Sequence, residues 1–273
     1  MTQSVDRALT ILASLSDGPA SLDQAAKRIG VHKSTAMRLL HTLEEHGFVH
    51  RQDDHRYRLG GRLFSLAQLA LEGFDVRRVA SPYLVAFNEH YDHAVHLAVL
   101  ENDDVIYVDK ADSRYPLPPR SSLGAASRIG RRAAPTASAA AKVLLADLPD
   151  DRREGLLADL EFPAYTPRSI RTVEAFRTEL EAVRTRGWAQ ERGEYDEAVN
   201  AVAVPVRGID GRVIAACSVS APTAAAPPAA LQELLPELMC TAEAISLAYG
   251  GQPTPRWCER RCGAKPAGRA IRT

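Results

Sequence analysis

The segment from residue 21 to residue 47 constrains the fold most, because it carries the start and stop signals of two successive helices. Ser21 and Gln24 have the Ser-x-x-Gln spacing of a capping box, and apolar residues then recur at helical spacing. Gly30 favours a turn after this first helix. Residues 32–46 predict a second helix with one apolar and one polar face, and Gly47 suits its left-handed C-terminal cap. The pattern predicts two short helices joined by a tight turn.

The next residues have the pattern of a small hairpin. Two short stretches, 48–52 and 56–59, read as strands on either side of the turn residues Asp53, Asp54 and His55. A helix, a turn, a polar-faced helix and a basic hairpin, in this order, are typical of a winged helix-turn-helix. In such a domain the second helix enters the major groove of DNA, and the hairpin is the candidate wing.

The candidate DNA contacts are polar residues of the second helix and basic residues of the hairpin. Any small helical domain also carries solvated charges, so these residues alone do not establish DNA binding. The ordered combination of independent signals favours a DNA-binding domain over that interpretation. The predicted DNA-binding residues are Lys33, Ser34, Thr35, Met37, Arg38, His41, Arg51 and Arg56.

Charge is distributed unevenly, although the formal net charge of the chain is zero. Residues 1–62 contain nine Lys and Arg against seven Asp and Glu, whereas residues 63–250 contain 19 against 26. Because phosphates repel an acidic domain, only the first part of the chain is expected to contact DNA. Residues 251–273, rich in Pro, Gly and Arg, predict a disordered basic tail.

The chain shows neither the pattern of a signal peptide nor a run of about 18 apolar residues. We therefore expect a cytoplasmic protein without a membrane segment. Cys258 and Cys262 suggest a metal site, but no nearby His or Cys completes the four ligands that zinc requires. No metal ion and no cofactor are expected.

The second half of the chain changes to a mixture of strand and helix patterns. Strands are expected at 94–101, 105–111, 201–206 and 213–220, and helices at 138–148, 151–160, 172–186 and 229–249. A further helix has Ser81 as a plausible N-cap and Pro82 at its first position. Hairpins separated by helices predict an α+β domain built on an antiparallel sheet. The expected domains are 1–60 for DNA binding, 61–74 as a linker helix, 75–250 as a second domain, and the tail.

Motifs spread along residues 4–250 carry a family resemblance. The front half contributes residues 4–9, Lys33-Ser34-Thr35, residues 43–49 and Tyr57-Arg58-Leu59-Gly60, and the back half contributes Thr166-Pro167, Gly187-Trp188-Ala189, residues 202–206, Asp210-Gly211 and residues 218–222. In this order and spacing the chain resembles the IclR family of transcriptional regulators. The resemblance implies a GAF-like effector-binding domain, and a dimer or tetramer bound to a palindromic DNA operator. The sign of regulation stays open between repressor and activator.

The resemblance also implies an effector pocket on one face of the sheet. Its expected residues are Ser138, Glu191, Ala201, Ser218 and Ser220. Ser218 and Ser220 are two apart on a strand, so both hydroxyls should project from one face while Cys217 and Val219 point to the other. Ser138 is expected to cap a helix whose N-terminus favours a carboxylate. A small carboxylate or aromatic acid is the expected effector, although the serines could instead satisfy neighbouring backbone groups.

The chain departs from the family at two places in this pocket. The usual Thr-Ala-x-Gly-Lys sequence becomes Ser138-Ala139-Ala140-Ala141-Lys142, and the usual Gly-Val-x-Cys sequence becomes Ala198-Val199-Asn200-Ala201. Because the second change removes a thiol, we expect a different or looser effector fit.

Two other classes of function were weighed against a regulator. An enzyme is disfavoured, because the chain has no Gly-x-Ser-x-Gly elbow, Walker loop, His-Glu-x-x-His or Cys-x-x-Cys sequence. A protein-interaction or dimerisation module stays an alternative. Salt dependence distinguishes it, because contacts with phosphate give an affinity that falls steeply with salt.

Overall fold

The computed structural model describes residues 3–72, 75–113 and 129–251, and the statements below concern these residues. The chain forms two compact units that divide after Gly73, and each is described by itself. Cys258, Cys262 and nearly all of the expected tail lie outside the described residues. Among the described helices, none combines the length and the apolar character that crossing a membrane requires.

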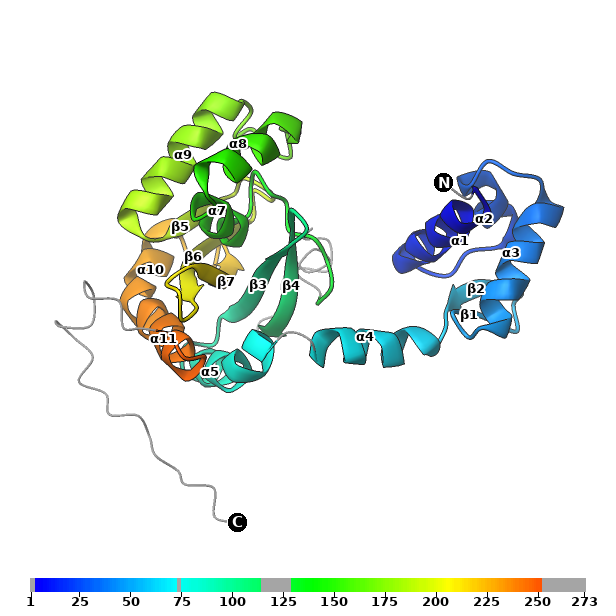
Figure 1. Cartoon of the computed structure of the whole chain (residues 1–273), viewed down its shortest axis with the longest axis horizontal. Helices are drawn as coiled ribbons and strands as arrows, with labels where there is room; N and C mark the ends of the chain where they lie inside the picture. Colours follow the sequence, from blue (N-terminus) through cyan, green and yellow to red (C-terminus); the bar gives the residue numbers. More distant parts are fainter. Residues whose placement is uncertain (1–2, 73–74, 114–128, 252–273) are drawn as a thin grey trace, which may run out of the picture. The chain divides into compact units, whose positions relative to one another are not determined.

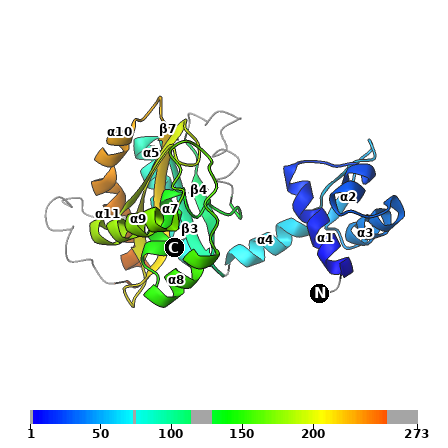
Figure 2. The ribbon, with the colours of Figure 1, turned by 90° about the horizontal axis from the view of Figure 1, so that it is seen from above.

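The first unit packs three helices against a two-stranded hairpin, and a further helix follows. Its elements are α1 (Gln3–Ser14), the 3₁₀ helix η1 (Leu15–Asp17), α2 (Leu22–Arg28), α3 (Lys33–Glu45), β1 (Val49–Arg51), β2 (Tyr57–Leu59) and α4 (Arg62–Glu72). The buried side chains of Ile11, Leu15, Leu40, Val49 and Tyr57 form its core. Figures 1 and 2 show α4 extending away from this core.

The local signals at residues 21–47 are confirmed. The Ser21 hydroxyl accepts from the Gln24 amide at 3.3 Å, and the Gln24 side chain accepts from the Ser21 amide at 2.8 Å. Gly30 and Gly47 adopt positive φ angles of 63° and 73°, which side chains with a Cβ rarely adopt. The hairpin pairs Val49 with Leu59 in antiparallel register.

The second unit is a five-stranded antiparallel sheet between two helical layers (Figure 1). The strand order is β4-β3-β7-β6-β5. The strands are β3 (Ala94–Glu101), β4 (Asp104–Ala111), β5 (Ala189–Arg192), β6 (Val199–Arg207) and β7 (Val213–Pro222), and the helices are α5 (Asp75–Tyr91), α7 (Ala139–Ala146), α8 (Asp150–Asp159), α9 (Val173–Arg186), α10 (Pro228–Glu233) and α11 (Leu235–Ala248). The predicted α+β class is confirmed.

The two faces of the sheet pack against different helices. Val95, Leu97, Cys217 and Val219 face α5, α10 and α11 in one apolar cluster. The opposite face carries mainly alanines and packs against α7 and α9 in a second cluster. The polar residues Glu191, Ser218 and Ser220 lie on this second face, on the side of the sheet that α7 covers.

Two predicted helix boundaries are wrong, both at a proline. Helix α5 begins at Asp75 and contains Pro82 in its interior, so Ser81 is not its N-cap. Its side chains Val76, Ala80 and Leu84 recur at helical spacing and are buried, and this burial offsets the hydrogen bond that a proline removes. The single helix expected at 229–249 is divided into α10 and α11, because Pro236 occupies the first turn of α11.

Strand β5 was not predicted. It has only four residues, Ala189–Arg192, and lies at the edge of the sheet, where it pairs with β6 alone. A strand of this length carries too few residues for its alternation to be recognised.

Candidate functional site

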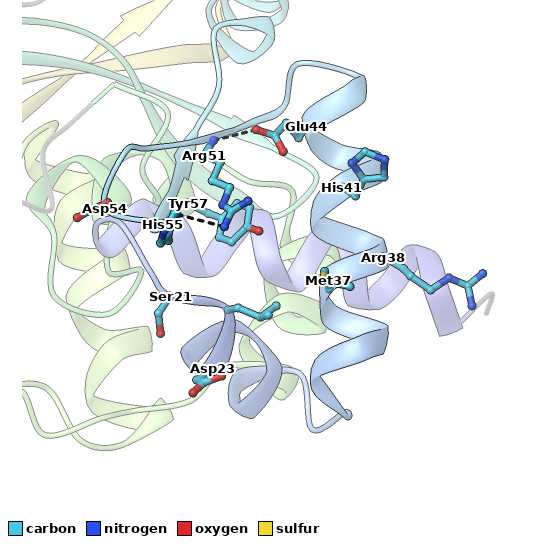
Figure 3. Close-up of a pocket in the computed structure, with 11 residues that line it drawn as sticks. Ser21, Asp23, Met37, Arg38, His41, Glu44, Arg51, Asp54, His55 and Tyr57 are labelled. Carbon is cyan, nitrogen blue, oxygen red and sulfur yellow. Dashed lines mark hydrogen bonds between the residues drawn. The ribbon is translucent and has the colours of Figure 1, made fainter.

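The polar face of α3 is exposed as predicted. Lys33, Ser34, Met37, Arg38 and His41 are exposed, whereas Thr35 is half-buried. The opposite side of the helix contributes Ala36 and Leu40 to the core. Beside α3 lies a hollow of about 630 Å³, shown in Figure 3 and lined by Ser21, Leu22, Asp23, Met37, Arg38, His41, Glu44, Arg51, Asp54, His55 and Tyr57.

The start of α3 is held by local contacts. The His32 side chain lies at the N-cap, where its Nδ1 accepts from the Ser34 amide at 3.4 Å and lies 3.0 Å from the Ser34 hydroxyl. The Lys33 ammonium pairs with Asp23 at 2.6 Å. His41 lies 3.4 Å from Glu45 one turn later.

Arg38 differs from these neighbours. Its guanidinium makes no hydrogen bond or ion pair with any residue that the structure describes, and Figure 3 shows it projecting away from the helix. A free guanidinium on an exposed helix face can bind the edge of a guanine or a phosphate.

The two wing arginines fold back onto their own domain. The Arg51 guanidinium lies 3.2 Å from His55 Nδ1 and 6.0 Å from the centre of the Tyr57 ring. Arg56 donates to the carbonyl of Pro19. Sequence reasoning placed both residues in the wing, but it could not identify these partners, because Pro19 lies far from Arg56 in the sequence.

In the second unit, strand register places four of the predicted effector residues on one face. Glu191 lies opposite Ala201, and Ala201 lies opposite Ser220. Ser218 pairs with Ala203 in the next row. Ala201 and Ala203 belong to the cluster beneath α7 and α9, so this row faces the same helices. The Ser220 hydroxyl is buried and has no hydrogen-bond partner among the described residues.

Ser138 has the N-cap position of α7, but its side chain does not cap the helix. Its hydroxyl instead lies 3.2 Å from the hydroxyl of Tyr107 on β4. The expected capping contact is therefore wrong, because Tyr107 competes for the same hydroxyl. Ala139, Ala140 and Ala141 then begin a helix whose first turn is buried.

Two aromatic residues of this face escaped sequence reasoning. His96 pairs with Ser218 across the sheet, and its ring centre lies 5.5 Å from that of Tyr107. Burial lowers the pKa of His96 to about 4 and raises the pKa of Tyr107 to about 12, so both groups are uncharged near neutral pH. Their positions within the predicted strands 94–101 and 105–111 were the available signal.

Buried charges lie at the end of the same face. The Lys142 ammonium, 1% exposed, donates to both carboxylate oxygens of Glu194 at 2.7 Å and to the Gln190 carbonyl at 2.9 Å. Glu191, 4% exposed, accepts from the Tyr195 amide at 3.2 Å. Burial raises the pKa of Glu191 to about 8, although the Lys142 charge opposes this increase.

The loop between β5 and β6 is fixed by two hydroxyl groups. Thr166 Oγ1 donates to the Gly193 carbonyl at 2.7 Å, and Ser169 Oγ donates to the Glu194 carbonyl at the same distance. These contacts hold the loop that carries Glu194 and Tyr195. Within the described residues no group of three or more His, Cys, Asp and Glu is placed to hold a metal ion.

Comparison with known families agrees with this arrangement. The family described as "Bacterial transcriptional regulator IclR C-terminal" matches residues 68–247, and the "IclR helix-turn-helix domain" matches residues 4–53. This chain belongs to the IclR family of transcriptional regulators. It therefore carries a DNA-binding helix-turn-helix and a C-terminal effector domain, and transcriptional regulators of this kind are not enzymes.

Individual relatives cover nearly the whole chain. The regulator XynR of Escherichia coli is 32% identical over 91% of this chain and 97% of its own length, and KdgR of the same bacterium is 32% identical over 86% and 87%. The crystal structure of Thermotoga maritima IclR, 27% identical, has a TM-score of 0.73 over 92% of this chain and all of that one. An IclR homologue from Microbacterium hydrocarbonoxydans in complex with 4-hydroxybenzoate, 25% identical, has the same score over 90% and 99%.

Proposed function

We propose that this IclR-family chain is a cytoplasmic transcriptional regulator that binds a palindromic operator as a dimer or tetramer and responds to a small organic acid. Its first 60 residues would bind DNA, residues 61–74 would link and help to dimerise the protein, and residues 75–250 would bind the effector. The proposed effector site rests on a polar row, defined here as Glu191, Ser218 and Ser220 on the alanine-rich face of the sheet. The observation that carries the DNA part is the free, exposed Arg38 beside the hollow of the first unit.

In the proposed complex, α3 enters the major groove. Arg38 contacts a base edge, and Met37 and His41 face the groove from the same side. Lys33, Ser34 and Thr35 lie near the start of the helix, where backbone amides favour a phosphate. Arg51 and Arg56 support the wing, and their present partners in the domain limit their reach to DNA.

The effector is proposed to be a small carboxylate or a hydroxylated aromatic acid. Ser218, Ser220 and Ser138 offer hydroxyl groups, Ala201 leaves space, and Glu191 bounds the site. The buried, unpartnered hydroxyl of Ser220 supports this proposal, because such a group loses hydrogen bonds that a ligand would restore. The 4-hydroxybenzoate found with a homologue is a compound of this class.

Binding must favour one DNA-binding state over the other. A ligand with equal affinity for both states shifts nothing, whatever its affinity. The ligand is therefore expected to change operator affinity and not only the thermal stability of its own domain.

A paired experiment tests the proposal. A thermal-shift screen of small organic acids identifies a ligand, and gel-shift titrations then measure operator affinity with and without it. The Ser218→Ala, Ser220→Ala double variant should bind the ligand poorly, whereas Cys217→Ala, on the opposite face of the same strand, should bind it like the wild type. Unchanged ligand affinity in the folded double variant would place the effector elsewhere.

A further inference from the structure

Glu191 lies at one end of the polar row, on the edge strand β5. Register places it opposite Ala201, which in turn lies opposite Ser220. The Tyr195 amide occupies one carboxyl oxygen of Glu191, Oε1, at 3.2 Å. For Oε2, no hydrogen bond to a described residue is found.

The Lys142 ammonium, whose charge lowers the Glu191 pKa, is held by other groups. An ammonium group has three N–H donors, and those of Lys142 meet three acceptors: both carboxylate oxygens of Glu194 and the Gln190 carbonyl. The Thr166 and Ser169 hydroxyls fix the loop that carries Glu194. Lys142 is thus committed to Glu194 by a rigid arrangement.

Among the described residues, the other groups that act on the Glu191 carboxyl supply no positive charge. Burial keeps the Tyr107 phenol of β4 and the His96 ring of β3 uncharged near neutral pH. Asp196 and Glu194 from the loop between β5 and β6 are acidic. An ionised Glu191 would therefore be a buried charge without a counter-ion of its own.

We propose that Glu191 is a carboxylic acid in the folded protein and donates its proton as a hydrogen bond to an anionic oxygen of the effector. The inference rests on the proposed effector site and defines its chemistry. The site recognises a carboxylate with neutral donors from its described residues, namely the Glu191 carboxyl and the serine hydroxyls. The effector and Glu191 then share one proton, so an effector that presents a cation at this position is rejected.

The proton makes effector binding depend on pH. The pKa of about 8 that burial gives Glu191 means that the acid form predominates at pH 7 and is lost above pH 8. A bound anion favours the protonated form, so the pKa rises further in the complex. Affinity for a carboxylate should therefore be constant below pH 7 and fall about tenfold per pH unit above pH 8.

Infrared difference spectroscopy tests the protonation state without a ligand. The spectrum of the full chain minus that of Glu191→Gln should contain the carbonyl band of a protonated carboxyl at pH 6, and this band should disappear on titration to pH 10. A spectrum that shows only ionised carboxylate at pH 6 overturns the inference.

Calorimetry with benzoate and 4-hydroxybenzoate tests the donation. Wild-type affinity for benzoate should fall above pH 8, whereas Glu191→Gln, which keeps a neutral donor, should bind benzoate with little dependence on pH. Equal pH dependence in the two proteins overturns the inference. Failure of both benzoate and 4-hydroxybenzoate to bind at pH 6 also overturns the inference. Operator binding measured on the same preparation shows whether the proposed DNA-binding function fails as well.

Glu194→Gln provides a second, opposite test. Removal of this carboxylate frees Lys142 to pair with Glu191, which should then ionise at lower pH. The decline of benzoate affinity should move below pH 8 in this variant. An unchanged profile in folded Glu194→Gln contradicts the role assigned to Lys142.

Discussion

Arg38 is the residue on which the DNA-binding proposal depends most directly. Lys33 and His41 on the same helix have acidic partners in the domain, whereas the Arg38 guanidinium has none among the described residues. Arg38→Ala should weaken specific operator binding by about 1 to 3 kcal/mol. Gel-shift titrations on operator and unrelated DNA measure this, with Arg78→Ala in the second unit as the charge-matched control. An equal loss of affinity for both DNAs would show that Arg38 contacts the DNA backbone and not a base edge.

The buried His96 ring is expected to make the folded protein less stable in acid. Burial lowers its pKa from 6.5 to about 4, so the unfolded state binds the proton more readily than the folded state. The stability that this shift contributes is present above pH 6.5 and is lost as the pH falls toward 4. Thermal unfolding of His96→Gln should show a smaller decrease between these pH values than the wild type. Parallel curves would contradict the buried, neutral ring.

Sequence reasoning predicted residue orientation better than residue contacts. The alternation at 217–220 placed Ser218 and Ser220 on one face, because a strand repeats every two residues. The Ser138 hydroxyl contacts the Tyr107 hydroxyl and does not cap its own helix. The ion pair between Lys142 and Glu194 was not predicted either. Such contacts join residues distant in sequence and depend on how the elements pack.

At the level of elements, the link from α7 to the loop after β5 is a buried ion pair. Removing one partner leaves the other as an unpaired buried charge, which typically costs about 3–5 kcal/mol. Lys142→Met should therefore lower the stability of the second unit strongly. Denaturant titration measures this against Lys110→Met, which breaks the more exposed pair with Asp112 and should cost at most about 1 kcal/mol. Similar losses of stability in both variants would show that the buried ion pair contributes no more to stability than the exposed one.

Elements with long, regular patterns were predicted well, and short or proline-containing ones were not. Strand β3 has the predicted bounds, and α9 begins after Thr172, whose hydroxyl caps it. Pro82 was interpreted as a helix start because proline is common there, but the burial of one face of α5 outweighs this local preference. The four residues of β5 gave no signal.

For the whole molecule, exposed apolar side chains support assembly. Phe64 and Leu69 on α4 are 78% and 64% exposed, and Val5 and Leu9 on α1 are 56% and 61% exposed. Ala8, Leu12, Leu39, Leu43 and Phe48 line the groove next to Val5 and Leu9. A second copy of the chain would cover such surfaces.

The double variant Phe64→Ser, Leu69→Ser should therefore shift the protein toward the monomer. Both side chains are exposed in the single chain, so its fold should be little affected. Sedimentation velocity at micromolar concentration measures the change, with Val85→Ser on α5, 44% exposed, as a control at an apolar surface residue outside α4. A wild type that sediments as a monomer would remove the basis for the proposed dimer.

The pairing of β3 has a consequence for synthesis of the protein. Strand β3 finds one neighbour, β4, immediately after it, but its other neighbour, β7, follows more than 100 residues later. A ribosome must therefore synthesise α7, α8, α9, β5 and β6 before β7 can close the open edge of β3. Open strand edges favour aggregation. Nascent chains arrested before Val213 should bind chaperones more strongly than chains arrested after the second domain is complete, and equal binding would show that β3 is protected by other means.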